Sequence, residues 1–120
     1  MKRKRNIALL GSTGSIGRQT LEVVSEYPDL FQAWVLVANN SADLLIEQAL
    51  KYAPQMVVIA NEAHYEKVKS ALAHTHIEVQ AGSQAVAECV TAPEIDIVVT
   101  AMVGYSGLEP TLKAIEAGKP

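Results

Sequence analysis

The stretch Ile7-Ala-Leu-Leu-Gly-Ser-Thr-Gly-Ser-Ile-Gly17 decides how this chain is expected to fold. Four apolar residues, Ile7 to Leu10, are followed by three glycines spaced three apart, and a helical pattern begins directly after them. An apolar run, a glycine-rich turn and a helix start, in this order, are typical of the first βαβ unit of a nucleotide-binding fold. The stretch therefore predicts a buried first strand, a tight turn and a first helix beginning near Ser15.

The composition of the turn predicts an anion-binding site. Glycine lacks a Cβ, so the backbone can adopt positive φ and come close to a diphosphate. The first N–H groups of the following helix have no partner inside the helix and carry the positive end of its dipole. Ser12, Thr13 and Ser15 add hydroxyl groups at the same place. The usual fingerprint is G-x-G-x-x-G, whereas the spacing here is G-x-x-G-x-x-G, and a strand-to-helix turn without a ligand is the alternative.

Strand and helix patterns alternate along the rest of the chain. Prolines end several of the helical patterns, as at Pro28, Pro54 and Pro93. Alternation with short connections predicts an α/β fold of the Rossmann-like, doubly wound type, with a mainly parallel sheet flanked by helices. The expected strands are 7–10, 32–38, 56–60, 77–80 and 95–101. The expected helices begin at Ser15, after the N-cap residues Ser41 and Asn61, at Gly82-Ser83, and at Leu108, the last one running to Ala117 after a loop at 102–107.

The first two helices are expected to be amphipathic. Apolar residues at helical spacing form a face that can pack on the sheet. The residues that fall on this spacing are Ile16, Thr20 in part, Leu21, Val23 and Val24 in the first helix, and Leu44, Leu45, Ile46, Ala49 and Leu50 in the second.

The composition indicates one globular domain with a substantial core. The chain has 120 residues, of which 49% are hydrophobic and 19% charged, values that are ordinary for a globular protein. The net charge of −3 argues against a nucleic acid or an anionic membrane as partner. No apolar run reaches the roughly 18 residues of a membrane span. The single cysteine, Cys89, fits a reducing compartment, so a cytoplasmic location is expected.

The end of the sequence predicts a longer protein. Each earlier helix is followed by a strand, whereas only Gly118-Lys119-Pro120 follows the last expected helix. A sheet that lacks its next strand would leave an unpaired edge. Residues 1–120 are therefore expected to be one domain at the front of a larger protein.

Three strand ends are the expected binding positions, because ligands of open α/β sheets bind beyond the carboxyl ends of the strands. The turn at 11–17 is expected to hold a pyrophosphate, the segment 39–41 an adenosine ribose, and the small residues of 101–107 the reactive half of a dinucleotide. Segment 39–41 reads Asn-Asn-Ser, without the acidic residue that binds the ribose 2′-OH in NAD-binding units, which favours NADP. It also lacks the Arg or Lys that best pairs with a 2′-phosphate. Asp43 is expected to be a helix-start charge rather than a ribose ligand.

No set of catalytic or metal-binding residues stands out in the sequence. His74 and His76 alternate and could share a face, but no cysteine or acid at ligand spacing accompanies them, and a solvated loop is expected there. His64 stands apart from both. The acidic residues Glu22, Glu26, Glu47, Glu62, Glu66 and Glu116 are expected on exposed helix faces.

The whole chain is similar to the N-terminal part of the 1-deoxy-D-xylulose 5-phosphate reductoisomerase family. The combination of several segments makes this resemblance far more specific than the glycine pattern alone. The segments that carry the resemblance are 11–17, 20–24, 28–31, 101–104, 107–115 and 118–119.

The resemblance implies the NADPH-binding domain of an isomeroreductase in non-mevalonate isoprenoid biosynthesis. The family converts 1-deoxy-D-xylulose 5-phosphate to 2-C-methyl-D-erythritol 4-phosphate, with Mg²⁺ or Mn²⁺ polarising the substrate oxygens, and its full-length members are usually homodimers. The catalytic residues, metal ligands and substrate-phosphate residues of the family would lie past Pro120, so none is expected in this chain, which alone is expected to be inactive. The family often has Lys or Arg where this chain has Asn-Asn-Ser. The residues implied to contact NADPH are Thr13, Gly14, Ser15 and Ile16, together with Asn39, Asn40 and Ser41 of the adenosine-ribose segment.

Two other functions are compatible with the residues. One is the NADP-binding domain of another reductase, such as a semialdehyde dehydrogenase, whose nucleophilic cysteine would lie beyond this region. The other is a nucleotide-sensing module without any chemistry, which predicts a gene that ends near codon 120.

Overall fold

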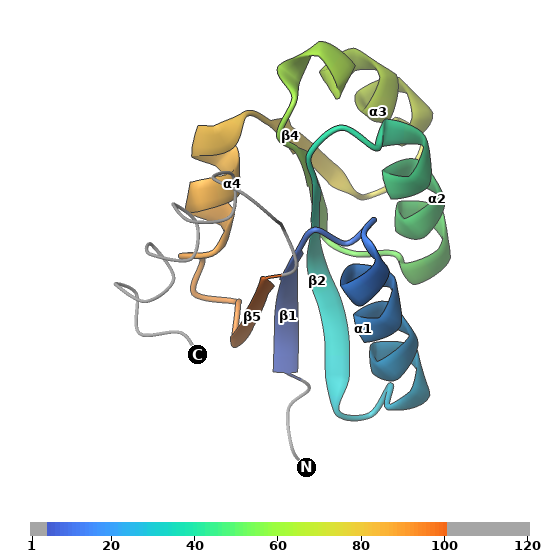
Figure 1. Ribbon diagram of the computed structural model, residues 1–120, viewed down its shortest axis with the longest axis vertical. Helices are drawn as coiled ribbons and strands as arrows, with labels where there is room; N and C mark the ends of the chain where they lie inside the picture. The colour runs from blue at the N-terminus through green and yellow to red at the C-terminus, as the bar shows by residue number, and fades with distance from the viewer. Residues whose placement is uncertain (1–4, 101–120) are drawn as a thin grey trace.

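The computed structural model describes residues 5–100, which form a parallel sheet with helices on both faces (Figure 1). The expected alternation of strands and helices is confirmed over this range. The loop expected at 102–107 and the helix expected at 108–117 lie outside the described residues. The elements are β1 (Arg5–Leu10), α1 (Ser15–Glu26), β2 (Phe31–Ala38), α2 (Ala42–Tyr52), β3 (Met56–Ile59), the 3₁₀ turn η1 (Glu62–His64), α3 (Tyr65–Ala71), β4 (Glu78–Ala81), α4 (Ser83–Cys89) and β5 (Ile97–Thr100).

The order of the strands confirms the doubly wound class. The sheet runs β4-β3-β2-β1-β5, and every neighbouring pair is parallel. The chain therefore moves outward from β1 to β4 on one side and returns to place β5 on the other side of β1. Leu10, at the end of β1, is paired with Val37 of β2 and with Thr100 of β5. The position where the strand order reverses is thus at the carboxyl end of β1, where such folds bind ligands.

Two apolar layers cover the sheet, one on each face. Leu9 and Leu36 pack with side chains of α1, α2 and α3, whereas Leu10 and Val37 pack with side chains of α4. Successive residues of β1 and β2 thus enter opposite layers, as the alternation of side chains along a strand requires. This explains why both strands read as unbroken apolar runs.

The buried face of α1 is narrower than its sequence predicts. Leu21 and Val24 are buried as expected, but Ile16 is 62% exposed and Val23 is 50% exposed. Gly17, Leu21 and Val24 lie three or four residues apart and form one buried stripe, while Ile16 and Val23 lie seven apart on another. Ile16 and Val23 therefore share the helical spacing but do not belong to the face of α1 that packs on the sheet. In α2 the same applies to Leu50, which is 53% exposed.

The last described strand begins two residues later than expected, at Ile97. Ile95 is buried but lies in a turn, where its N–H donates to Ala92 O. Asp96 follows, and its Oδ2 accepts a hydrogen bond of 2.8 Å from the N–H of Asn6. Asn6 also donates from Nδ2 to Glu94 O at 2.9 Å, so this turn is attached to the start of β1 before β5 begins.

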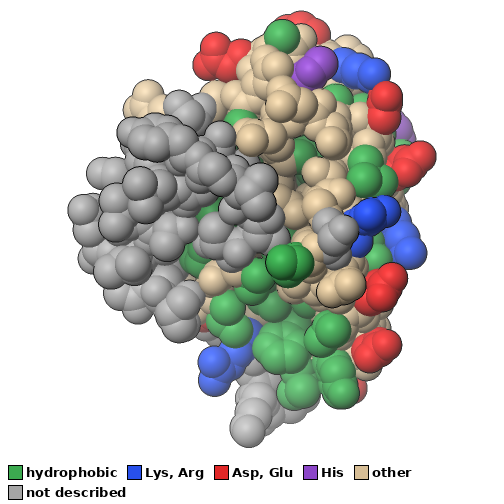
Figure 2. All heavy atoms as spheres, in the orientation of Figure 1, with side chains coloured by type: hydrophobic (Ala, Val, Ile, Leu, Met, Phe, Trp, Pro, Cys, Tyr) green, Lys and Arg blue, Asp and Glu red, His purple; other side chains and the backbone are tan. Residues whose placement is uncertain are grey.

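The visible surface carries charges of both signs. Figure 2 shows acidic and basic side chains interspersed over the helices α1 to α3, without a continuous basic stripe. Hydrophobic side chains gather near the amino ends of β1 and β2, where Tyr27 and Leu30 are about half exposed (51% and 49%). Among residues 5–100, no helix combines the length and the apolarity needed to cross a membrane.

Cys89 is a core residue on α4, and its chemistry is that of an inert thiol. It is buried, and its Sγ donates to Val86 O at 3.1 Å. Burial disfavours the thiolate and raises the pKa of the Cys89 thiol to about 12, against a smaller lowering by a backbone hydrogen bond. A nucleophilic role at neutral pH is incompatible with a thiol of this kind.

This pKa predicts a loss of stability in alkali. The folded chain keeps the Cys89 proton up to about pH 12, whereas the unfolded chain releases it above about pH 8.5. The free energy of unfolding should therefore fall as pH rises through this window, by about 2 kcal/mol at pH 10 from this group. Urea unfolding at pH 8 and pH 10 measures this fall in the free energy of unfolding. Cys89→Ala is the control, because it lacks the thiol but shares every other titrating group. An equal pH dependence in both proteins would contradict the prediction.

Candidate dinucleotide-binding site

The glycine turn lies at the carboxyl end of β1 and is attached to the neighbouring strand. The N–H groups of Gly11 and Ser12 both donate to Val37 O of β2, at 2.8 and 3.0 Å. The N–H of Gly14 donates back to Gly11 O at 3.2 Å, which closes the turn before α1 begins. The position of the turn is thus set by the sheet.

The three glycines of the turn are required for three different reasons. Gly11 has a φ of +89°, a conformation that residues with a Cβ rarely adopt. Gly14 has an extended backbone (φ −78°, ψ 173°), and a Cβ there would meet only Gly11 O, at 3.6 Å, so the space beside it is open. Gly17 is buried, and a Cβ there would lie 2.1 Å from Gly11 O and 2.7 Å from Ser12 Cα. The first glycine shapes the turn, the second leaves a surface free, and the third lets α1 pack on the turn.

The start of α1 has the properties of an anion site. Its N-cap residue is Gly14, which offers no capping side chain, and its first turn contains no acidic residue. The N–H of Arg18 donates to Gly14 O at 2.9 Å, whereas those of Ile16 and Gly17 make no hydrogen bond to the described residues. Open N–H groups at the positive end of a helix dipole favour a negatively charged group. The expected anion cradle therefore fits the structure, and a Cβ at Gly14 would partly fill it.

The segment Asn39-Asn40-Ser41 follows β2 and is held by the chain after β3. The N–H of Asn61 donates to Asn39 O at 2.9 Å, and its Nδ2 donates to Asn40 Oδ1 at 2.8 Å. Asn61 also caps η1, as expected, by accepting from the N–H of Ala63 at 3.0 Å. Ser41 takes the expected N-cap position of α2, but its side chain makes no capping hydrogen bond. The segment is thus ordered while the Ser41 hydroxyl stays exposed.

Asp43 is engaged by the next helix. Its Oδ1 lies 2.7 Å from Nζ of Lys67 on α3, in an exposed ion pair. A pair of this kind contributes little stability. It does, however, direct the carboxylate toward α3. Asp43 lies in the first turn of α2, as expected of a helix-start charge.

The structure brings two of the three expected binding segments together. The turn at 11–17 and the segment 39–41 follow strands that are paired side by side, with Leu10 level with Val37. Thr13 and Asn39 are half-buried, whereas Gly14, Ile16, Asn40 and Ser41 are exposed, so these positions are open to a ligand. The third segment, 101–107, lies outside the described residues. Contact of the individual residues with a cofactor stays a prediction.

Sequence reasoning missed one residue that touches the turn. Gln48, in the middle of α2, is only 6% exposed, and its Nε2 donates to Ser12 O at 2.7 Å. The available signal was its position, since Gln48 follows Leu45 by three residues and precedes Ala49 on the buried side of the helix. A polar side chain on a buried stripe requires a hydrogen-bonding partner.

A glycine-rich turn with open N–H groups, at the reversal point of the parallel sheet that residues 5–100 form, defines a dinucleotide-binding domain of the doubly wound class. The family model of 1-deoxy-D-xylulose 5-phosphate reductoisomerase matches residues 7–120. The chain belongs to this family, and the resemblance seen in its sequence is confirmed.

Individual relatives agree with this assignment. The 1-deoxy-D-xylulose 5-phosphate reductoisomerase of Porphyromonas gingivalis is 60% identical over 116 residues, covering 97% of this chain and 30% of the relative. That of Saccharophagus degradans is 48% identical over 117 residues, covering 96% and 30%. The chain spans about 30% of the length of these curated relatives.

Solved structures of the family have the same fold. The Zymomonas mobilis reductoisomerase in complex with NADPH superposes with a TM-score of 0.91 at 35% identity, covering 98% of this chain and 31% of that one. A reductoisomerase in complex with NADPH, fosmidomycin and magnesium gives 0.91 at 29% identity, covering 96% and 28%.

Proposed function

We propose that this chain is the NADPH-binding part of an enzyme that converts 1-deoxy-D-xylulose 5-phosphate to 2-C-methyl-D-erythritol 4-phosphate. The observation that carries the proposal is the open surface beside Gly14, next to the unpaired N–H groups of α1. The family membership and the NADPH in related structures support it. The rival functions, a semialdehyde dehydrogenase domain and a free nucleotide sensor, lack such support.

NADPH would be held by two segments with separate tasks. Backbone N–H groups from Thr13 to Ile16 would bind the diphosphate, with Gly14 allowing its close approach. Asn39, Asn40 and Ser41 would bind the adenosine ribose. No Arg or Lys lies in this second segment, so amide and hydroxyl donors would hold the 2′-phosphate. The ion pair with Lys67 partly neutralises the negative charge of Asp43, which would lessen its repulsion of that phosphate.

The remaining parts of the reaction belong to the full-length protein. NADPH supplies the hydride, and this domain binds and orients it. We propose that the phosphorylated sugar, the divalent metal (Mg²⁺ or Mn²⁺) and the catalytic residues lie in further domains. Magnesium is present in related solved structures, which supports the metal. A cytoplasmic homodimer is our proposal for the whole enzyme.

Calorimetric titration of the 120-residue chain tests the proposed function. We expect saturable binding of NADPH at one site and weaker binding of NADH, because segment 39–41 offers no carboxylate to the ribose 2′-OH. We expect no turnover of 1-deoxy-D-xylulose 5-phosphate by the chain alone. Heats no larger than those of buffer injections, with the chain shown to be folded by circular dichroism, would contradict the cofactor site.

A further inference from the structure

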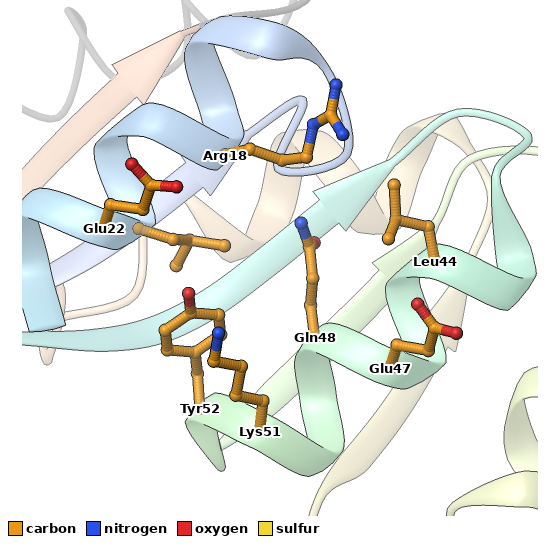
Figure 3. Close-up of a pocket in the computed structure, with 8 residues that line it drawn as sticks. Arg18, Glu22, Leu44, Glu47, Gln48, Lys51 and Tyr52 are labelled. Carbon is orange, nitrogen blue, oxygen red and sulfur yellow. The ribbon is translucent and has the colours of Figure 1, made fainter.

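Gln48 connects the second helix to the main chain of the glycine turn. Its side chain extends from α2 toward the turn, between Arg18 and Leu44 (Figure 3). It forms the inner wall of a hollow of about 220 Å³ between α1 and α2. The bond from Nε2 to Ser12 O is short, at 2.7 Å, and is buried.

The bond fixes the orientation of one peptide group in the turn. Ser12 is fully buried, its N–H donates to Val37 O, and its carbonyl accepts from Gln48. In a planar trans peptide the carbonyl and the following N–H point in opposite directions. Because Ser12 O points to Gln48, the N–H of Thr13 points away from it. That N–H makes no hydrogen bond to the described residues.

We propose that Gln48 is a positioning residue that aims the N–H of Thr13 at the cofactor diphosphate. This inference rests on the proposed function, since it assumes a diphosphate at the turn. It also links the two binding segments, because α2 begins directly after Ser41 and reaches the turn through Gln48.

Packing alone does not account for an amide at this position. Within the described residues, Gln48 Oε1 and Ser12 Oγ are buried and have no hydrogen-bond partner. An unpaired buried oxygen disfavours folding. An apolar side chain of the same length would avoid that penalty at Gln48, but it would leave the buried Ser12 O without its donor, so the amide supplies this one bond.

The variant Gln48→Glu tests the inference through pH. A protonated carboxyl group can donate to Ser12 O, whereas an ionised one repels it, and burial raises the pKa of a carboxyl group. The probe is ADP-ribose, which carries the diphosphate without a 2′-phosphate, titrated calorimetrically at pH 5.5 and pH 8. At pH 8 we expect Gln48→Glu to bind ADP-ribose about tenfold more weakly than the unmodified chain does, which corresponds to the loss of one hydrogen bond. At pH 5.5 most of this affinity should return.

Two further variants complete the design. Gln48→Met, an apolar side chain of similar length, is expected to bind about tenfold more weakly at both pH values. Glu47→Gln changes an exposed neighbour that lines the same hollow and should bind like the unmodified chain. The charged side chains lining the hollow are Arg18, Glu22, Glu47 and Lys51, and no histidine is among them.

The outcomes separate the inference from the proposed function. Absence of NADPH binding by the unmodified chain would overturn both, whereas absence of ADP-ribose binding by a chain that binds NADPH would overturn the positioning role alone. Unchanged binding by Gln48→Met, or a loss in Gln48→Glu that is the same at both pH values, would overturn the positioning role alone. Thermal melts of each variant at both pH values give the folded fraction, for which the affinities are corrected.

Discussion

Gly17→Ala is expected to destabilise the fold by about 3 kcal/mol, the upper part of the range for overpacked positions. The new methyl group would lie 2.1 Å from Gly11 O and 2.8 Å from Ser12 C, which are main-chain atoms of a turn held by β2. Neither can move aside as a flexible side chain could. Alanine gains about 1 kcal/mol over glycine inside a helix, which only partly offsets the clash.

Urea unfolding followed by circular dichroism measures this effect. Gly14→Ala is the matched control in the same turn, because its methyl group would meet a single atom at 3.6 Å and its φ of −78° suits any residue. We expect the control to unfold within about 0.5 kcal/mol of the unmodified chain, as at most exposed positions. Equal unfolding midpoints for both variants would mean that α1 can move off the turn without a penalty.

The sequence was sufficient to predict the fold because its signals are local. The run Ile7–Leu10, the glycines after it and the repeated change from strand to helix patterns each lie within a few residues of one another. Such signals determine the type and order of elements. The Asn61 cap could be predicted for the same reason, because its partner Ala63 is only two residues away.

Features that depend on docking could not be predicted in this way. Helical spacing identifies apolar stripes on α1, but which stripe faces the sheet depends on how closely Gly17 lets the helix approach. The spacing alone therefore does not show that Ile16 and Val23 lie outside the buried stripe. The role of Gln48 could not be predicted, because its partner is a main-chain oxygen 36 positions earlier and no pattern of side chains reveals such a bond. The glycine spacing likewise does not show that Gly11 is needed for its positive φ, whereas Gly14 is needed because it leaves an open surface.

Gly14→Val is expected to abolish NADPH binding while leaving the chain folded. The extended backbone of Gly14 is compatible with valine, which favours extended conformations. Its side chain would project into the open space where the diphosphate must approach the N–H groups of α1. Hydrogen bonds to a charged group contribute about 1.5–3 kcal/mol each, so preventing two of them should weaken binding by at least about 100-fold.

Calorimetry with NADPH gives the affinity, and urea unfolding of the same preparation gives the stability. Gly14→Ala provides the intermediate step, since one methyl group fills less of the space and should weaken binding less than valine does. NADPH affinity retained by a folded Gly14→Val chain would mean that the diphosphate does not bind against this turn. Because Gly17→Ala acts on folding and Gly14→Val on binding, the two substitutions separate the glycine that builds the turn from the glycine that serves the ligand.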